Sequence, residues 1–251
     1  KNNGLFVGKT YTLPLNKSVS TKIDTVADTK IIVKNNKDSI TLIKTEKHIL
    51  FGKENAKVII EKEDLKGAVY YLISGHGGPD PGAITTYKNK LIAEDEYAYD
   101  VTLRLARRLI SYGAKVYVII KDVNDGIRDD SILEVDYDEG NYPNEKISKS
   151  QVLRLKQRTQ TVNSLFFKHK NKYQRLIVTH VDSRSESKNI DVFFYHHKNS
   201  KKGKRLAENI HNSFKQKYAK YQPNRMYTGT VGSRGLYLIR NTLPAMVYIE
   251  L

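Results

Sequence analysis

From Gly67 onward, strand-like and helix-like segments alternate, and this alternation restricts the fold more than any other feature of the chain. The expected strands are short apolar runs, and they cover residues 68–73, 115–120, 175–179, 190–195, 235–239 and 246–249. The expected helices have apolar residues three and four apart, and they cover residues 94–111, 151–167 and 201–218. Alternating strands and helices predict an α/β fold, with a largely parallel twisted sheet and helices on both faces.

The first part of the chain has a different pattern. Two short β-like runs, Lys30–Lys34 and Ser39–Ile43, flank the turn-rich segment Asn35–Asp38, which predicts a hairpin. The histidine of this part, His48, is expected to be a surface or packing residue. We therefore expect residues 1–65 to form a small β-rich extension or module, and residues 66–251 to form the main domain.

The chain is basic, with 43 Lys and Arg against 27 Asp and Glu and a formal net charge of +16. Clustered positive charge favours nucleic acid through counterion release, but here the charge is spread over every segment. We expect no nucleic-acid partner, although a diffuse positive field can attract an anionic polymer such as a bacterial envelope. No apolar stretch approaches the roughly 20 residues of a membrane span. We expect a monomer without a transmembrane segment.

The apolar run 68–73 leads directly into a glycine-rich segment, Ser74–Ala83, which contains one histidine, His76. In α/β folds ligands bind outside the carboxyl ends of the strands, where such loops lie. Glycines let the backbone adopt positive φ and approach a ligand closely. Taken alone, the loop could be a phosphate cradle or could present a metal ligand.

Two further residues could complete a metal site with His76. His180 follows the run 175–179, and Glu94 opens the first expected helix. The chain has no cysteine, so a metal must use His, Asp or Glu, and two histidines with one carboxylate form a usual catalytic zinc set. Glu96 is the alternative carboxylate if the helix begins later. Glu250 ends the last apolar run, where it could move a proton during hydrolysis.

Other polar residues near these positions have supporting or structural explanations. Asp182 could orient the ring of His180 as a hydrogen-bond acceptor. Asp80 is expected to fix its own turn through backbone hydrogen bonds rather than bind metal. His196 and His197 end another expected strand, and we interpret them as surface or packing residues.

The segment Gly75–Ala83 resembles the signature loop of the zinc-dependent N-acetylmuramoyl-L-alanine amidases, the amidase type 3 family. The similarity covers about residues 67–251. It continues in order through Glu94, Leu103–Leu105, Gly113–Val116, Leu155–Arg158, Thr179–Asp182, Leu206–Ile210, Gly235–Arg240, Pro244–Ala245 and Ile249–Leu251.

This resemblance implies a site and a reaction. His76, Glu94 and His180 match the family's ligands for one Zn²⁺ ion, and Glu250 matches its catalytic glutamate. The expected reaction is hydrolysis of the amide between N-acetylmuramic acid and the L-alanine of the peptidoglycan stem peptide, by metal-activated water. Arg240 is a candidate for contacting an anionic group of the substrate. The resemblance also implies an extracytoplasmic bacterial enzyme, periplasmic or secreted.

Between residues 122 and 150 the chain has no clear period and is rich in acidic residues. This insertion is longer than the family's usual connection, and in some relatives an inserted segment blocks the zinc until a partner removes it. We therefore expect a lid that an activator protein relieves. Two rival functions stay open: a zinc peptidase or amidohydrolase acting on another acyl substrate, and a basic non-enzymatic protein that binds wall polymer or nucleic acid.

Overall fold

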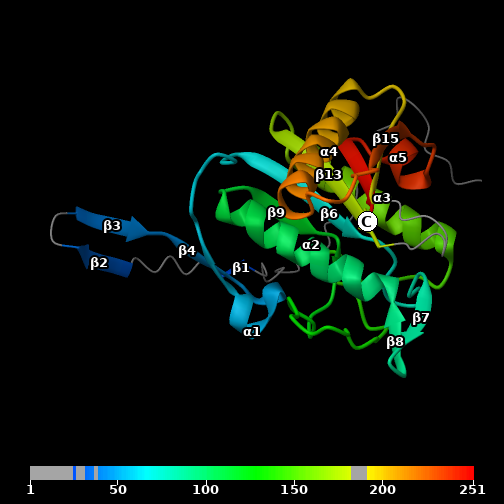
Figure 1. Ribbon diagram of the computed structural model, residues 1–251, viewed down its shortest axis with the longest axis horizontal. Coiled ribbons are helices and arrows are strands. Elements are labelled where there is room, and N and C mark those ends of the chain that lie inside the picture. The colour runs from blue at the N-terminus through cyan, green and yellow to red at the C-terminus, as the bar shows by residue number, and fades with distance from the viewer. Residues whose placement is uncertain (1–24, 27–31, 37–38, 182–190) are drawn as a thin grey trace, which may run out of the picture.

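A six-stranded sheet with strand order β15-β14-β16-β13-β6-β9 lies at the centre of the computed structural model, which describes residues 25–26, 32–36, 39–181 and 191–251 (Figure 1). Its strands are β6 (Ala68–Ser74), β9 (Lys115–Val118), β13 (Tyr173–His180), β14 (Phe193–His196), β15 (Thr230–Ser233) and β16 (Ala245–Glu250). Strands β9, β6, β13 and β16 run parallel, whereas β14 and β15 run in the opposite direction. The predicted α/β class with a largely parallel sheet is confirmed.

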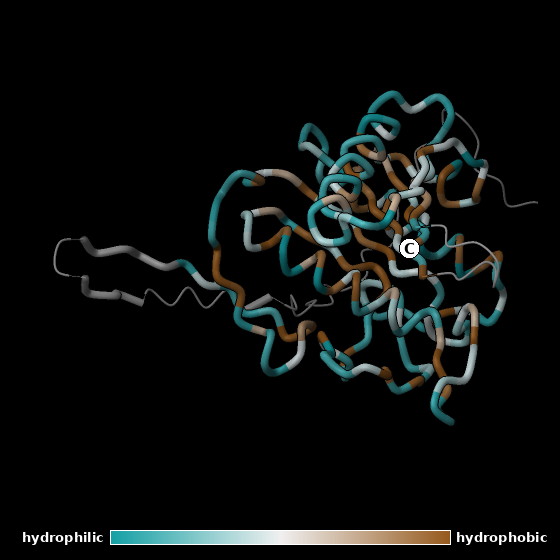
Figure 2. Tube along the Cα trace, viewed as in Figure 1, coloured by the Kyte–Doolittle hydropathy of each residue, from teal (hydrophilic) through white to brown (hydrophobic). Residues whose placement is uncertain are grey.

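Helices cover both faces of this sheet, as the alternation predicted. They are α2 (Glu94–Ser111), α3 (Gln151–Lys168), α4 (Lys201–Tyr221) and α5 (Tyr237–Asn241). Successive side chains of a strand point to opposite faces. Accordingly, Leu72 packs with Leu103 on the face covered by α2 and α4, whereas Tyr71 packs with Val162 on the face covered by α3 and α5. The apolar stretches of Figure 2 gather in the central sheet, while much of α4 is hydrophilic.

One expected strand was wrong. Residues 235–239 were predicted as a strand, but the short helix α5 occupies Tyr237–Asn241. Leu238 and Ile239 are buried against the sheet face, and a short buried apolar run has the same composition in a strand and in a helix. The strand in this part of the chain is β15, whose glycine and half-exposed side chains give a weak strand pattern.

The expected hairpin of the N-terminal region is confirmed. Strands β2 (Ile32–Asn36) and β3 (Ser39–Ile43) pair antiparallel and extend away from the central sheet in Figure 1. Strands β1 (Thr25–Val26), β4 (Thr45–His48) and β5 (Lys57–Ile59) form a second small sheet, and between β4 and β5 lie η1 (Ile49–Phe51) and α1 (Gly52–Asn55). Phe51 and Val58 are buried in the same core cluster as Leu103 of α2. The domain boundary between residues 65 and 66 stays a prediction.

The remaining elements are short, and they come after β6 and β9 in the chain. They are the hairpin β7 (Ile84–Tyr87) and β8 (Lys90–Ala93), and the small sheet of β10 (Ile120–Lys121), β11 (Gly140–Asn141) and β12 (Glu145–Lys146). The predicted run 115–120 is thus divided between β9 and β10. Among the helices of the described residues, none combines the length and apolarity of a bilayer span.

Candidate metal centre

The end of strand β13 lies at the carboxyl edge of the sheet, between the ends of β6 and β16. His180 is the last residue of β13, and it pairs in register with Glu250, the last residue of β16. Paired residues of neighbouring parallel strands point to the same face, so these two side chains leave the sheet together. The ring of His180 also stacks on Tyr248, with the ring centroids 4.7 Å apart. Both predicted strand-end residues are therefore placed at one edge.

The loop after β6 and the start of α2 bring the other two predicted residues to this edge. Glu94 is the first residue of α2, and the backbone N–H of Ala83 donates to its Oε2 atom at 3.1 Å. The Glu94 carboxylate lies between two imidazoles. Its Oε1 atom is 2.8 Å from Nδ1 of His180, and its Oε2 atom is 3.2 Å from Nε2 of His76. Donor atoms of all three residues lie within 4.8 Å of one another.

Two glycines of the loop permit this close packing. A Cβ atom on Gly75 would lie 2.5 Å from ring atoms of His180. Gly82 has φ of +72°, and a Cβ atom there would lie 2.7 Å from both Glu94 Oε2 and the ring of His76. Only glycine tolerates a positive φ at little cost and leaves this space open. The glycine-rich composition therefore serves side-chain packing at the site.

Helix α3 contacts the loop of residues 74–83 that carries His76, called the histidine loop below. The guanidinium of Arg158 donates to the backbone carbonyl of His76 at 2.5 Å, and that of Arg154 donates to Asp80 at 2.6 Å. The Oδ2 atom of Asp80 is in turn 3.1 Å from Nδ1 of His76. Asp80 also accepts from the N–H of Gly82 at 3.4 Å, which is the turn-fixing contact expected from the sequence. Its second contact, with the imidazole, was not expected.

The charges of this cluster stabilise one another. Although burial disfavours a charged ring, Asp80 and Glu94 raise the pKa of His76 to about 9. Burial likewise disfavours a charged Glu94, but the two imidazoles hold the pKa of that carboxyl well below its usual range. The hydrogen bond to His76 lowers the pKa of Asp80 below its usual range. Two imidazole nitrogens and one carboxylate form a donor set that fits zinc, and Asp80 fits the outer acceptor that orients such a histidine.

Glu250 is buried beside this group, with 7% of its surface exposed. Glu96, the alternative ligand, instead contacts Arg128 at 2.9 Å and accepts from the N–H of Asp136 at 2.9 Å. Arg240 is exposed on α5, and Asp182 lies outside the described residues. His196 is buried and contacts the carbonyl of His197 at 2.9 Å at the opposite end of the sheet.

The acidic insertion of residues 122–150 packs against the histidine loop. The N–H of Gly78 donates to Glu139 at 2.6 Å, and the side chain of Ile147 packs against the same glycine. Among the described residues, the insertion adds no donor to the group of His76, Glu94 and His180. It does form a second group, with Asp95 and Glu96 of α2, in which all three carboxylates are buried. Sequence reasoning missed this group, because a run of acidic residues is typical of a solvated surface.

Burial raises the pKa of all three members of the second group, Asp95, Glu96 and Glu139. The pKa of Asp95 rises to about 8, through burial and through the charges of Glu139 and Glu96. Burial raises the pKa of Glu139 to about 7.

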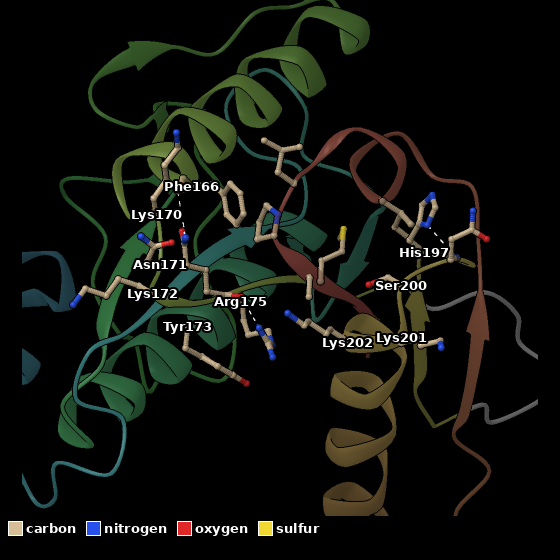
Figure 3. A pocket seen from close by; sticks show the side chains of 17 residues that line it. Phe166, Lys170, Asn171, Lys172, Tyr173, Arg175, His197, Ser200, Lys201 and Lys202 are labelled. Carbon is tan, nitrogen blue, oxygen red and sulfur yellow. Dashed lines mark hydrogen bonds between the residues drawn. The ribbon is translucent and has the colours of Figure 1, made fainter.

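A cavity of about 910 Å³ lies at the amino end of β13 and β16 (Figure 3). Its basic lining residues are Lys170, Lys172, Arg175, Lys201 and Lys202, and none of its described lining residues is acidic. Strand β13 has 8 residues, and at about 3.3 Å per residue it separates this cavity from His180 by roughly 20 Å. The cavity is therefore separate from the candidate metal centre.

Comparisons with known proteins identify a family and a related fold. A sequence model of the family described as N-acetylmuramoyl-L-alanine amidase matches residues 71–251. Comparison with curated protein sequences gives no match. The CwlD amidase from Clostridioides difficile, solved in complex with the GerS lipoprotein, is 22% identical and superposes with a TM-score of 0.51 over 72% of this chain and 80% of that chain. This likeness supports the fold.

Two other solved structures are more distant. An N-acetylmuramoyl-L-alanine amidase from Clostridium difficile 630 is 15% identical, with a TM-score of 0.49 over 74% of this chain and 79% of that one. The apo form of the amidase Ami1 from Mycobacterium abscessus is 14% identical, with a TM-score of 0.47 over 74% and 84%. The family match alone runs from within β6 to the end of β16, and on that ground the chain belongs to the N-acetylmuramoyl-L-alanine amidase family, amidase type 3.

Proposed function

We propose that this protein is a zinc-dependent N-acetylmuramoyl-L-alanine amidase. Its reaction is hydrolysis of the amide that joins the lactyl group of N-acetylmuramic acid to the L-alanine of the stem peptide. Membership of the family supports the class of reaction. The observation that carries the proposal is the convergence of His76, Glu94 and His180 at one edge of the sheet, with donor atoms within 4.8 Å of one another.

Three side chains of the site would hold one zinc ion. His76 and His180 supply neutral imidazole nitrogens, and Glu94 supplies a carboxylate. Bound zinc supplies Lewis acidity, which polarises an amide carbonyl and lowers the pKa of water toward about 7. Asp80 fixes the orientation of the His76 ring, because its Oδ2 atom lies 3.1 Å from the ring nitrogen that faces away from Glu94.

Glu250 is the residue that we assign to proton transfer. It lies on the strand next to His180, at the paired position, and on the same face of the sheet. Its carboxylate accepts a proton from the attacking water as the new C–O bond forms. It then donates that proton to the alanine nitrogen as the C–N bond breaks, so that the products are a carboxylic acid and a free amine.

We also propose roles for two further residues and for the acidic insertion, and a location for the protein. Arg240 and Asp182 keep the roles proposed from the sequence, contact with an anionic substrate group and orientation of His180. The insertion of residues 122–150 is proposed as the segment on which an activator protein acts, since it contacts the loop that carries His76. A complex of the related CwlD amidase with a lipoprotein supports a partner of this kind. Because peptidoglycan lies outside the cytoplasm, we infer an extracytoplasmic location, periplasmic or secreted.

The test is hydrolysis of purified cell walls by the zinc-loaded protein, with product analysis. We expect about one zinc per chain, loss of activity with a chelator, and recovery when zinc is returned. The released peptides should carry a free amino group on L-alanine. Peptides with a different new amino terminus would assign the site to a zinc peptidase. Wall binding without hydrolysis, unchanged by the chelator, would contradict an enzymatic role.

A further inference from the structure

Three carboxylates lie buried together beside the histidine loop. Asp95 is 1% exposed, Glu96 is 2% exposed and Glu139 is 6% exposed. Asp95 and Glu96 belong to the first turn of α2, whereas Glu139 comes from the acidic insertion. Each offers a carboxylate oxygen, and these oxygens lie within 4.8 Å of one another. Two segments far apart in the chain therefore bring three acidic groups to one buried point.

Among the described residues, one oxygen of these three carboxylates is buried without a hydrogen-bond partner. Glu96 contacts Arg128 and the N–H of Asp136. One oxygen of Glu139 accepts from the N–H of Gly78. The Oδ1 atom of Asp95 accepts from the N–H of Glu96 at 3.0 Å, but its Oδ2 atom is buried and has no hydrogen-bond partner in the described part of the chain.

Such an arrangement is costly without a further positive charge. A buried charge is normally paired or coordinates a metal, and a buried acceptor left unsatisfied costs on the order of 1–3 kcal/mol. Arg128 forms an ion pair with Glu96, whereas no Lys or Arg of the described residues forms an ion pair with Asp95. A cation between the three carboxylates would satisfy the free oxygen of Asp95 and offset the repulsion among the acids.

The donor set selects the kind of cation. All three donors are carboxylate oxygens, which suit hard cations such as Ca²⁺ and Mg²⁺, whereas imidazoles suit zinc. Ca²⁺ accepts about 6–8 oxygen ligands in a flexible geometry, whereas Mg²⁺ requires a near-ideal octahedron and usually keeps several waters, so a buried set of three carboxylates favours Ca²⁺.

We propose that Asp95, Glu96 and Glu139 bind a hard divalent cation, with Ca²⁺ as the first choice, at a site separate from the group of His76, Glu94 and His180. This cation fastens the acidic insertion to the start of α2. Because Glu139 also accepts from the N–H of Gly78, the cation holds the histidine loop through the same side chain. The site is a structural one, and it does not depend on the proposed amidase activity.

The test uses the zinc-loaded full chain. Thermal unfolding is followed without added cation and with CaCl₂ or MgCl₂, and Ca²⁺ binding is titrated by calorimetry. At a free Ca²⁺ concentration about 100 times Kd, we expect the unfolding midpoint to rise by about 5 °C or more, and Mg²⁺ should raise it less. Calorimetry should give about one Ca²⁺ per chain.

Variants locate the site. Asp95→Asn and Glu139→Gln should each lose most of the Ca²⁺-dependent rise, while zinc content and circular dichroism show that they fold. The matched control, Asp130→Asn, removes an exposed charge of the same insertion and should keep the full rise.

Three results would overturn the inference: no Ca²⁺ or Mg²⁺ binding by the wild-type chain, a full rise in Asp95→Asn, or loss of the rise in the control Asp130→Asn. The wild-type titration decides the matter even if both site variants fail to fold. Failure of wall hydrolysis would leave the inference intact, because binding and unfolding are measured without substrate.

Discussion

The two ends of the central sheet differ in packing and in charge. At the carboxyl end, His76, Glu94 and His180 contact one another, and glycines leave room for their side chains. At the amino end, five Lys and Arg side chains line an open cavity, and none of them forms a salt bridge among the described residues (Figure 3). A cavity lined by basic side chains is therefore not where the candidate catalytic residues lie. The candidate reaction site lies where a few opposite charges converge and are partly buried.

The largest effect is expected from removing a proposed ligand at the carboxyl end. His180→Ala should lose bound zinc and reduce wall hydrolysis to background, because two donors cannot complete the set. Metal content by atomic absorption and hydrolysis of purified walls are the measurements. Lys202→Ala, at the amino end, is the control and should keep both. Equal losses in the two variants would remove the contrast between the ends.

A smaller effect is expected when the proton-transfer group is neutralised. Glu250→Gln keeps the shape of the side chain but cannot take up a proton, so kcat should fall by about 10²–10⁴-fold while zinc content stays unchanged. Steady-state kinetics and metal analysis check this. If the variant hydrolyses walls at the wild-type rate, Glu250 has no part in proton transfer.

Packing at the carboxyl end can be disturbed without changing any charge. Gly75→Ala places a methyl group 2.5 Å from the ring of His180, and overpacking of this kind costs about 1–3 kcal/mol. We expect weaker zinc binding and a lower free energy of unfolding. Gly232→Ala is the matched control, since the nearest atom of Tyr195 would lie 3.9 Å from the new methyl group. Equal zinc affinity in both variants would show that the ring of His180 has room to move.

The smallest effect concerns pH. In the metal-free protein the pKa of His76 is raised to about 9, and zinc must displace this proton. Zinc affinity should therefore increase by up to tenfold per pH unit between pH 7 and 9, as measured with a competing chelator dye. The same raised pKa stabilises the metal-free protein fully below the unfolded value near 6.5, and this stabilisation is lost as the pH rises through 9.

Asp80→Asn tests that assignment. It removes one of the two carboxylates that raise the pKa of His76, so the slope of zinc affinity against pH above pH 7 should become flatter. An unchanged slope would place the titrating group elsewhere.

Much of the fold was predictable from the sequence. The strands around the sheet centre are continuous apolar runs, and α2 begins at Glu94, where the pattern placed it. Strand β15 and helix α5 were not predictable, because a half-exposed strand has little pattern and a short buried helix resembles a strand.

The candidate site was predictable to a similar extent, and for a physical reason. His76 and His180 follow buried strands, and parallel strands bring their carboxyl ends together. The buried group of Asp95, Glu96 and Glu139 gave no signal, because its burial depends on how the insertion folds back. The contact between Asp80 and His76 also needed the path of the loop.

The position of β16 has a consequence for the order of folding. It is the last strand in sequence, yet it lies between β13 and β14 and alone connects β14 and β15 to the other strands of the described sheet. Before β16 is inserted, the sheet consists of two separate pieces. Distant pairings of this kind form slowly. Both Glu250 and Tyr248, on which His180 stacks, belong to this strand, so the proposed centre stays incomplete until β16 is inserted.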